Sequence, residues 1–101
     1  MFDKLFEARQ KAEEIKKRLD QITVVGEAEG GQVTVTATGN KEVTNITIAQ
    51  SFLDSADKEE LEEVLAVAVN KAIQQAENVS QTEMQAATKD MLGGLGGMFG
   101  Q

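Results

Sequence analysis

The chain has 101 residues and a net charge of −7, and it contains no histidine, cysteine, tryptophan or tyrosine. Its length fits a single domain, and 41% of its residues are hydrophobic, which is enough for a core of aliphatic side chains. Without histidine and cysteine there is no Ser-His-Asp or Cys-His catalysis, no disulfide and no ordinary zinc site, so we expect no enzyme, no cofactor and no metal.

The N-terminal segment MFDKLFEARQ is charged from its third residue, which argues against a signal peptide. No apolar run approaches the roughly 18 residues that a membrane-spanning helix needs. We therefore expect a cytoplasmic protein that does not enter a membrane.

Residues 3–21 are predicted to form a helix with a narrow apolar seam. The seam follows a strict 3-4-3-4-3 spacing through Leu5, Ala8, Ala12, Ile15, Leu19 and Ile22. Three cations recur every seven residues along one flank, and two lie along the other: Lys4, Lys11 and Arg18, then Arg9 and Lys16. These cations indicate either a surface that binds a polyanion or a solvated helix with i,i+4 pairs, Glu7–Lys11 and Glu13–Lys17.

The charge of the chain is unevenly distributed. Residues 1–20 hold six of the ten cations and five of the 17 anions, a net charge of +1. The remainder holds four cations and twelve anions, a net charge of −8. A polyanion would therefore meet its most favourable surface on the N-terminal helix.

Three antiparallel strands are predicted next, near residues 22–29, 32–39 and 42–49. Two glycine-containing turns separate them, Gly30-Gly31 and Gly39-Asn40. The middle segment alternates, so Val33, Val35 and Ala37 should be buried. Val43 and Ile46 are out of phase, which predicts a bulge or a late strand start. Because such a core is thin, a second copy that covers an apolar face would help to stabilise it.

A long helix follows, beginning with DKEELEEVLAVAVNKA. Asp57 stands three residues before Glu60, the spacing of a helix N-cap, and the acids there complement the positive end of the helix dipole. A metal-binding or protein-binding patch is the alternative interpretation of this acidic run. Ser80-Gln81-Thr82-Glu83 resembles a second capping box, which predicts a break or a bend near Asn78 and a restart toward Met91.

The last nine residues, GGLGGMFGQ, lack the GxGxxG spacing and the preceding strand of a phosphate-binding loop. We expect a flexible tail at 93–101 after a single domain at 1–92. The carboxylates of that domain lie on predicted helix surfaces, where nothing marks out a desolvated catalytic pair.

The predicted elements contain, in this order, a set of residues that is typical of a known protein family. VVGEAEGGQVTVTATGNKEVTNITI, followed by SFL and DKEELEEVLAVAVNKA, resembles the YbaB/EbfC family of bacterial nucleoid-associated DNA-binding proteins over nearly the whole chain. The most specific positions are Gly26, Gly30, Gly31, Val33, Val35, Gly39, Val43, Ile46, Ile48, Leu53 and the stretch from Leu61 through Asn70 to Ala72.

The resemblance implies a small α+β protomer with an N-terminal helix, a three-stranded antiparallel meander and a long C-terminal helix. It also implies an intertwined homodimer whose sheets meet centrally and whose helices project like tweezers around a DNA duplex. Charged residues of the terminal helices are the expected DNA contacts. In this chain they are Lys4, Arg9, Lys11, Lys16, Lys17 and Arg18, with Lys89 on the last helix as a further candidate.

Two functions remain open. The leading hypothesis is a nucleoid-associated homodimer that binds duplex DNA, is largely tolerant of sequence and has no catalytic activity. The alternative is an acidic protein-interaction module of DNA recombination or repair, with the same fold and little DNA affinity. The resemblance suggests this alternative, because genes of the family often neighbour recombination genes. The clustered N-terminal cations favour the first hypothesis, and the net charge of −7 favours the second.

Overall fold

The computed structural model describes the backbone of residues 2–98 and the side-chain environment of residues 4–89. It contains an N-terminal helix, a three-stranded antiparallel sheet, a short helix and a long C-terminal helix. The elements are α1 (Phe2–Gln21), β1 (Thr23–Ala28), β2 (Val33–Thr38), β3 (Val43–Ile48), α2 (Gln50–Ser55) and α3 (Lys58–Met98). This confirms the predicted α+β class and the order of its main elements.

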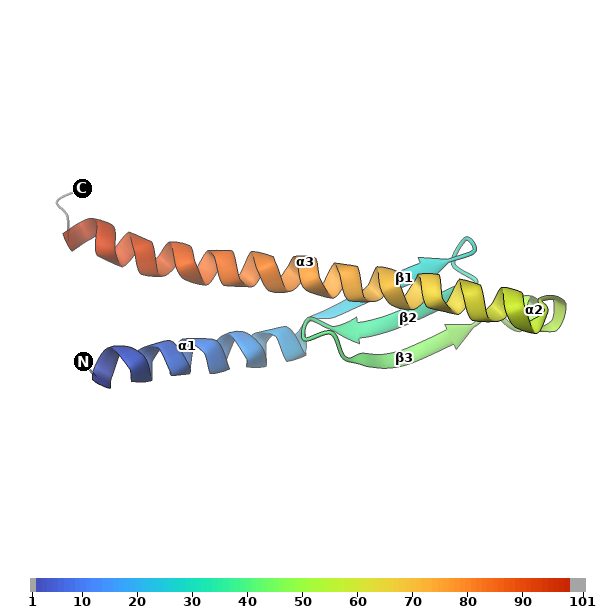
Figure 1. The fold of residues 1–101 in the computed structure, drawn as a ribbon, viewed down its shortest axis with the longest axis horizontal. Helices are drawn as coiled ribbons and strands as arrows, with labels where there is room; N and C mark the ends of the chain where they lie inside the picture. The colour runs from blue at the N-terminus through green and yellow to red at the C-terminus, as the bar shows by residue number, and fades with distance from the viewer. Residues whose placement is uncertain (1, 99–101) are drawn as a thin grey trace.

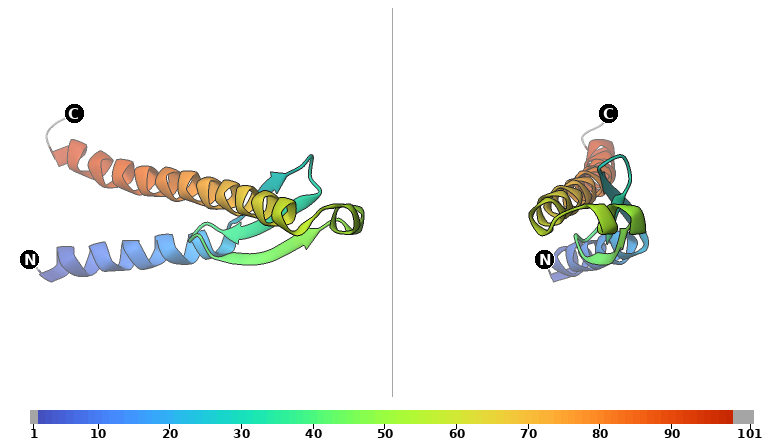
Figure 2. Two further views of the ribbon diagram at one scale, coloured as in Figure 1. Left: turned by 45° about the vertical axis from the view of Figure 1, so that its right-hand side comes forward. Right: turned by 90° about the vertical axis from the view of Figure 1, so that its right-hand side faces the viewer.

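The molecule is long and thin, with extents of 65 × 25 × 18 Å (Figure 1). Its radius of gyration is 19.3 Å, whereas a compact domain of this length has about 13 Å. α1 and the C-terminal part of α3 project from the same end of the sheet, and α2 lies at the opposite end (Figures 1 and 2). We call α1 and the part of α3 beyond Ala76 the two arms.

The sheet has the order β1-β2-β3, with both pairs antiparallel. The pairing of β2 with β3 shifts between Thr36, which faces Asn45, and Ala37, which faces Val43. Thr44 is therefore an extra residue in β3, and its hydroxyl donates a hydrogen bond to the Thr36 carbonyl at 3.3 Å. This confirms the bulge that the out-of-phase residues predicted.

α3 packs across β1 and β2 and buries one face of these two strands. The predicted alternation in β2 is confirmed, because Val33, Val35 and Ala37 are at most 1% exposed. The same apolar cluster contains Val24, Ala28, Phe52, Val64, Ala68, Ala72 and Ala76. The core is therefore built from small and aliphatic residues, with a single phenylalanine closing it at the α2 end.

α3 approaches β1 so closely at Gly26 that no side chain fits between them. A Cβ atom at Gly26 would overlap the backbone carbonyl oxygen of Ala68 and the backbone nitrogen of Ala72. Both helix residues are alanines with 0% exposure. A glycine inside a strand often marks such a close approach of a second backbone, and here it sets the spacing between helix and sheet.

The predicted N-cap of the long helix is confirmed. Asp57 lies one residue before the first residue of α3. One of its carboxylate oxygens accepts a hydrogen bond from the Glu60 backbone N–H at 2.8 Å. Glu59 and Glu60 lie in the first helical turn, where negative charge is favourable. The acidic run is therefore accounted for by the start of a helix.

The predicted break near Asn78 is wrong, since α3 passes through Ser80–Glu83 as one continuous helix. A capping box would need Ser80 outside the helix. Instead the Thr82 hydroxyl donates to the Asn78 carbonyl at 2.9 Å, a bond within the helix that satisfies this polar side chain. Half-buried Val79 packs against the core and holds this turn in the helix.

The helical assignment continues into the glycine-rich segment as far as Met98, and Phe99–Gln101 lie outside the described residues. The flexibility of 93–101 and the domain boundary at residue 92 remain predictions. The short helix α2 was not predicted. It spans six residues and has no side-chain hydrogen bond at its N-cap, Ala49.

Replacing Gly26 with Ala should lower the free energy of unfolding by about 3 kcal/mol or more, because α3 must move away from the sheet to admit the methyl group. Chemical denaturation followed by circular dichroism measures this change. Gly30→Asn is the control, since Gly30 has φ +65° and open space around it, a conformation that Asn tolerates. A Gly26→Ala protein as stable as the Gly30→Asn protein would contradict this account of the packing.

Deleting residues 93–101 should leave the melting temperature nearly unchanged, because within residues 4–89 the core cluster reaches no further than Ala76 and its last packed neighbour is Val79. Differential scanning calorimetry of the full and shortened chains tests this. A fall of several degrees would mean that apolar side chains of the tail dock on the folded protein.

Candidate nucleic-acid interface

The apolar seam of α1 is buried at only one end. Leu19 is 4% exposed, Ile15 is half-buried, and Ala12 and Ala8 are exposed. Leu5 is 67% exposed. The helix therefore packs on the rest of the protein through its last turns, and the remainder stands free in the protomer.

Hydrogen bonds fix this attachment to the turn between β2 and β3. The Gly39 N–H donates to the Leu19 carbonyl at 2.9 Å and to the Ile22 carbonyl at 3.1 Å. The Asn40 side-chain amide donates to the Lys16 carbonyl at 2.9 Å and also to the Asp20 carboxylate. The end of α1 is thus anchored by main-chain and side-chain bonds as well as by Leu19.

The charges of α1 are sorted between two sides of the helix. At 100° per residue, five cations lie on the two flanks of the apolar seam: Lys4, Arg9, Lys11, Lys16 and Arg18. The acids with described side chains lie farther from the seam, beside these flanks, and Lys17 lies among them on the outer side of the helix: Glu7, Glu13, Glu14 and Asp20. The half of the helix surface that is centred on the seam therefore carries cations and no described acid, although the total charge of the helix is close to neutral.

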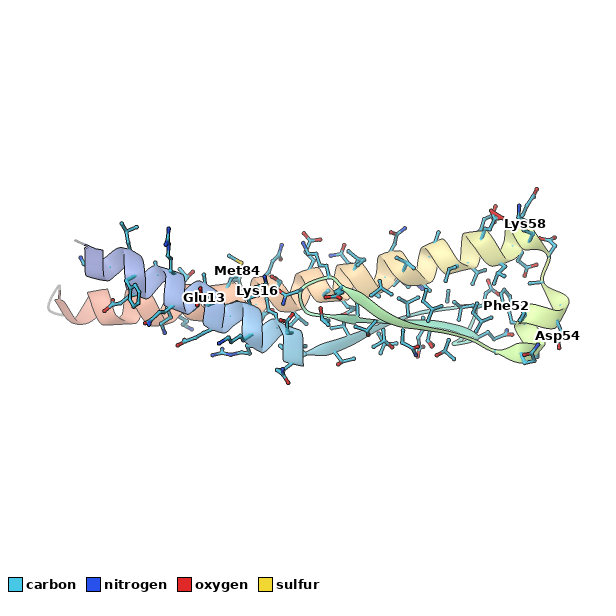
Figure 3. The ribbon with its side chains drawn as sticks, turned by 90° about the horizontal axis from the view of Figure 1, so that it is seen from below. Glu13, Lys16, Phe52, Asp54, Lys58 and Met84 are labelled. Atoms are coloured by element: carbon cyan, nitrogen blue, oxygen red, sulfur yellow. The ribbon has the colours of Figure 1, made fainter. Side chains whose placement is uncertain are left out.

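The structure brings together most of the predicted DNA contacts. Among the side chains that it describes, none forms a salt bridge with Lys4, Arg9, Lys11 or Lys16, and all four are exposed. The Glu7–Lys11 and Glu13–Lys17 pairs accordingly do not form salt bridges. Figure 3 shows Lys16 on the α1 arm, far from Lys58 at the start of α3.

The other three predicted contacts are placed differently. Lys17 is exposed on the side of α1 away from the seam. Arg18 forms a salt bridge with Glu83 of α3, with 2.9 Å between Nη1 and Oε2. Lys89 is exposed on the α3 arm, on a different side of that helix from Glu83.

Glu83 is a residue whose role the sequence interpretation missed. The sequence pattern predicts a place for it in a capping box, but its carboxylate links the two arms through Arg18. A second pair joins Lys41, in the turn that anchors α1, to Glu77 of α3 at 3.9 Å. Charge alone could not predict these partners, because Arg18 and Glu83 are 65 residues apart in the sequence.

Other kinds of site have little support in the described part of the chain. A hollow of about 510 Å³ lies between β1 and α3, lined by Val25, Gly26, Glu27, Lys71, Gln74 and Gln75. It offers one carboxylate and one amine, with no pair of acids. Within residues 4–89 no cluster of three potential metal-ligating side chains occurs. Nor does any described helix have the length and apolar character needed to cross a membrane.

Comparison with known proteins gives a consistent result. Residues 1–91 match the model of the YbaB/EbfC DNA-binding family. A nucleoid-associated protein of Flavobacterium johnsoniae is 38% identical, over 97% of this chain and 91% of the relative. One from Chlorobium phaeobacteroides is 36% identical, over 93% of this chain and 83% of the relative.

A solved structure is also similar, that of an uncharacterized protein from Helicobacter pylori. Its TM-score is 0.65 at 22% sequence identity, and the match covers 77% of this chain and 90% of the other. At this level of identity the likeness concerns the fold alone.

Proposed function

We propose that this chain, which belongs to the YbaB/EbfC DNA-binding family, is a nucleoid-associated homodimer that binds duplex DNA with little regard to sequence. The family is one of non-catalytic DNA-binding proteins. The observation that carries the proposal is the sorting of charge on α1, where cations flank the exposed seam and acids lie behind it. The names of the relatives, nucleoid-associated proteins, support the proposed location.

Exposed lysine and arginine side chains can neutralise the phosphates of a duplex. Phosphate contacts provide affinity and orientation but carry no direct sequence information. The chain has no tryptophan or tyrosine. Among the described phenylalanines Phe52 is buried and Phe6 stands alone on α1, so the described part of the chain offers no row of aromatic side chains on which successive single-stranded bases could stack. Duplex DNA with little sequence preference is therefore the ligand that fits best. Lys17 and Lys89 are assigned secondary contacts, because neither lies beside the seam.

An uncovered apolar row on the sheet supports the homodimer. In the pairing of β2 with β3, Val35 faces Ile46 and Ala37 faces Val43, so these β3 side chains share the face that α3 covers elsewhere. The helix packs mainly over β1 and β2, and Ile46 and Val43 are 44% and 38% exposed. A second copy that packs on this row would complete the core.

The exposed area of the protomer agrees with this proposal. The accessible surface is 7550 Å², whereas a monomeric protein of this mass exposes about 5,600 Å². In an intertwined dimer the two sheets would meet at the β3 rows, and each protomer would contribute its arms. Six α1 cations per protomer would then give twelve, arranged around a duplex.

The wild-type protein should sediment as a dimer at micromolar concentration, and Ile46→Lys should shift it toward the monomer because an unpaired charge would enter the apolar interface. Analytical ultracentrifugation gives the mass, and circular dichroism checks the fold. Thr47→Lys is the matched control, since Thr47 faces Thr34 on the other side of the sheet. A single 10.9 kDa species for the wild type would refute the dimer.

Reversing Lys4 and Lys11 to Glu should weaken duplex binding at least about tenfold without unfolding the protein, because both side chains are exposed and lie outside the core. Lys58→Glu with Lys71→Glu is the matched control, because each pair of reversals takes the net charge from −7 to −11. The control pair should reduce affinity less than about threefold. Electrophoretic mobility shift or fluorescence anisotropy with several unrelated duplexes measures both effects.

Wild-type affinity should also fall steeply with salt. Two or three phosphate contacts per protomer give a dimer slope of about −4 to −5 in log affinity against log salt. If the control reversals lower DNA affinity as much as the reversals on α1, the DNA interface does not lie on α1. If no duplex is shifted even at low salt, the acidic protein-interaction module of recombination or repair becomes the better hypothesis, and partners among those proteins should be sought.

A further inference from the structure

We propose that the exposed part of the α1 seam is also a docking site for an acidic amphipathic helix of another protein. The binding itself follows from the geometry and charge of α1. Only the added consequence, that such a helix would compete with DNA for the same cations, rests on the proposed function.

The exposed seam has the width of one coiled-coil interface. Leu5, Ala8, Ala12 and Ile15 follow the a and d positions of a heptad repeat, and the spacing runs on to buried Leu19. The side chains at positions 8 and 12 are single methyl groups, so a second helix could approach the α1 backbone closely there. From Leu5 to Ile15 the seam extends for about three turns, or about 16 Å.

The protomer leaves this part of the seam open. The Arg18–Glu83 pair marks the place where the arms meet, and beyond it they separate toward their free ends (Figures 1 and 2). Met84, one residue after Glu83, is 57% exposed. The α3 arm of the same chain therefore does not cover α1 toward its N-terminus.

The flanking charges decide which helix can occupy the seam. Lys4, Lys11 and Arg18 take the g positions, and Arg9 and Lys16 take the e positions. In a parallel pair of α1 helices each g residue would face an e residue, and in an antiparallel pair like positions would face each other. Both arrangements oppose cation to cation, so α1 is unsuited to pair with another copy of itself.

A helix with Glu or Asp at its own e and g positions meets the opposite charge along both flanks. The Arg18–Glu83 pair is an example within the chain, because a g-position cation of α1 bonds a carboxylate presented by a neighbouring helix at 2.9 Å. An anionic membrane surface would also attract the cations. The narrow seam with alanine at two of its positions favours a helix, since interfacial helices bury a broad face of bulky side chains.

Two synthetic peptides test the proposal on the full-length protein. Each has about four heptads with Leu at a and d, and they differ only in carrying Glu or Lys at every e and g position. Fluorescence anisotropy of the labelled peptides should show binding of the Glu peptide and none of the Lys peptide. Unlabelled Glu peptide should release a bound duplex. No binding of the Glu peptide, or equal binding of both, would overturn the proposal.

A neutral seam variant separates this proposal from the proposed function. Leu5→Gln, Ala8→Gln and Ala12→Gln together alter exposed seam positions and keep every cation. They should lower affinity for the Glu peptide at least about tenfold and affinity for the duplex less than about twofold. If the wild type binds the Glu peptide but no DNA, the docking site stands and the proposed function fails.

Co-sedimentation with phosphatidylserine vesicles tests the membrane interpretation. We expect the protein to remain in the supernatant. Vesicle binding that the three Gln substitutions abolish, in a protein that does not bind the Glu peptide, would assign the seam to a membrane surface instead.

Discussion

The contact of α3 with β1 at Gly26 is the constraint on which the rest of this structure depends. Because the helix backbone lies directly against the strand there, the axis of α3 is held over β1 and β2. The helix residues at the contact, Ala68 and Ala72, are small and fully buried, so no larger side chain fits between α3 and β1. The same placement leaves β3 without a cover and carries the second half of α3 past the end of the sheet, where it becomes an arm.

The second arm depends on a smaller contact. Leu19 and the bonds from Gly39 and Asn40 anchor the end of α1, and a salt bridge from Arg18 ties it to α3. Residues 4–14 lie N-terminal to these contacts and are exposed, so their side chains are accessible to a partner. The segregation of cations from acids then has a clear effect, because a protein with net charge −7 can still present a cationic surface to DNA or to an acidic helix.

Local patterns predicted most of the fold, and long-range contacts account for what they missed. A few neighbouring residues are enough to predict each of three features: the alternation around Val35, the N-cap at Asp57 and the seam of α1. The break near Asn78 was predicted wrongly because its local signal yields to packing of the same helix on the core. The pairing of Arg18 with Glu83 depends on the tertiary fold. The helix α2 was missed because six residues are too few to show a helical repeat of apolar side chains. The DNA contacts on α1 remain predictions, since sequence fixes their spacing along the helix but not their ligand.

Because α1 is attached to the rest of the protein at one end, a small rotation there moves its other end by a larger distance. A helix of 20 residues is about 30 Å long, so a rotation of about 10° at Leu19 would displace its far end by about 5 Å. That displacement exceeds the rise of about 3.4 Å per nucleotide along one DNA strand. The rigid α3–sheet unit would not need to deform for such a movement. The distance between the free ends of the two arms could therefore vary while the core of the protein stays unchanged.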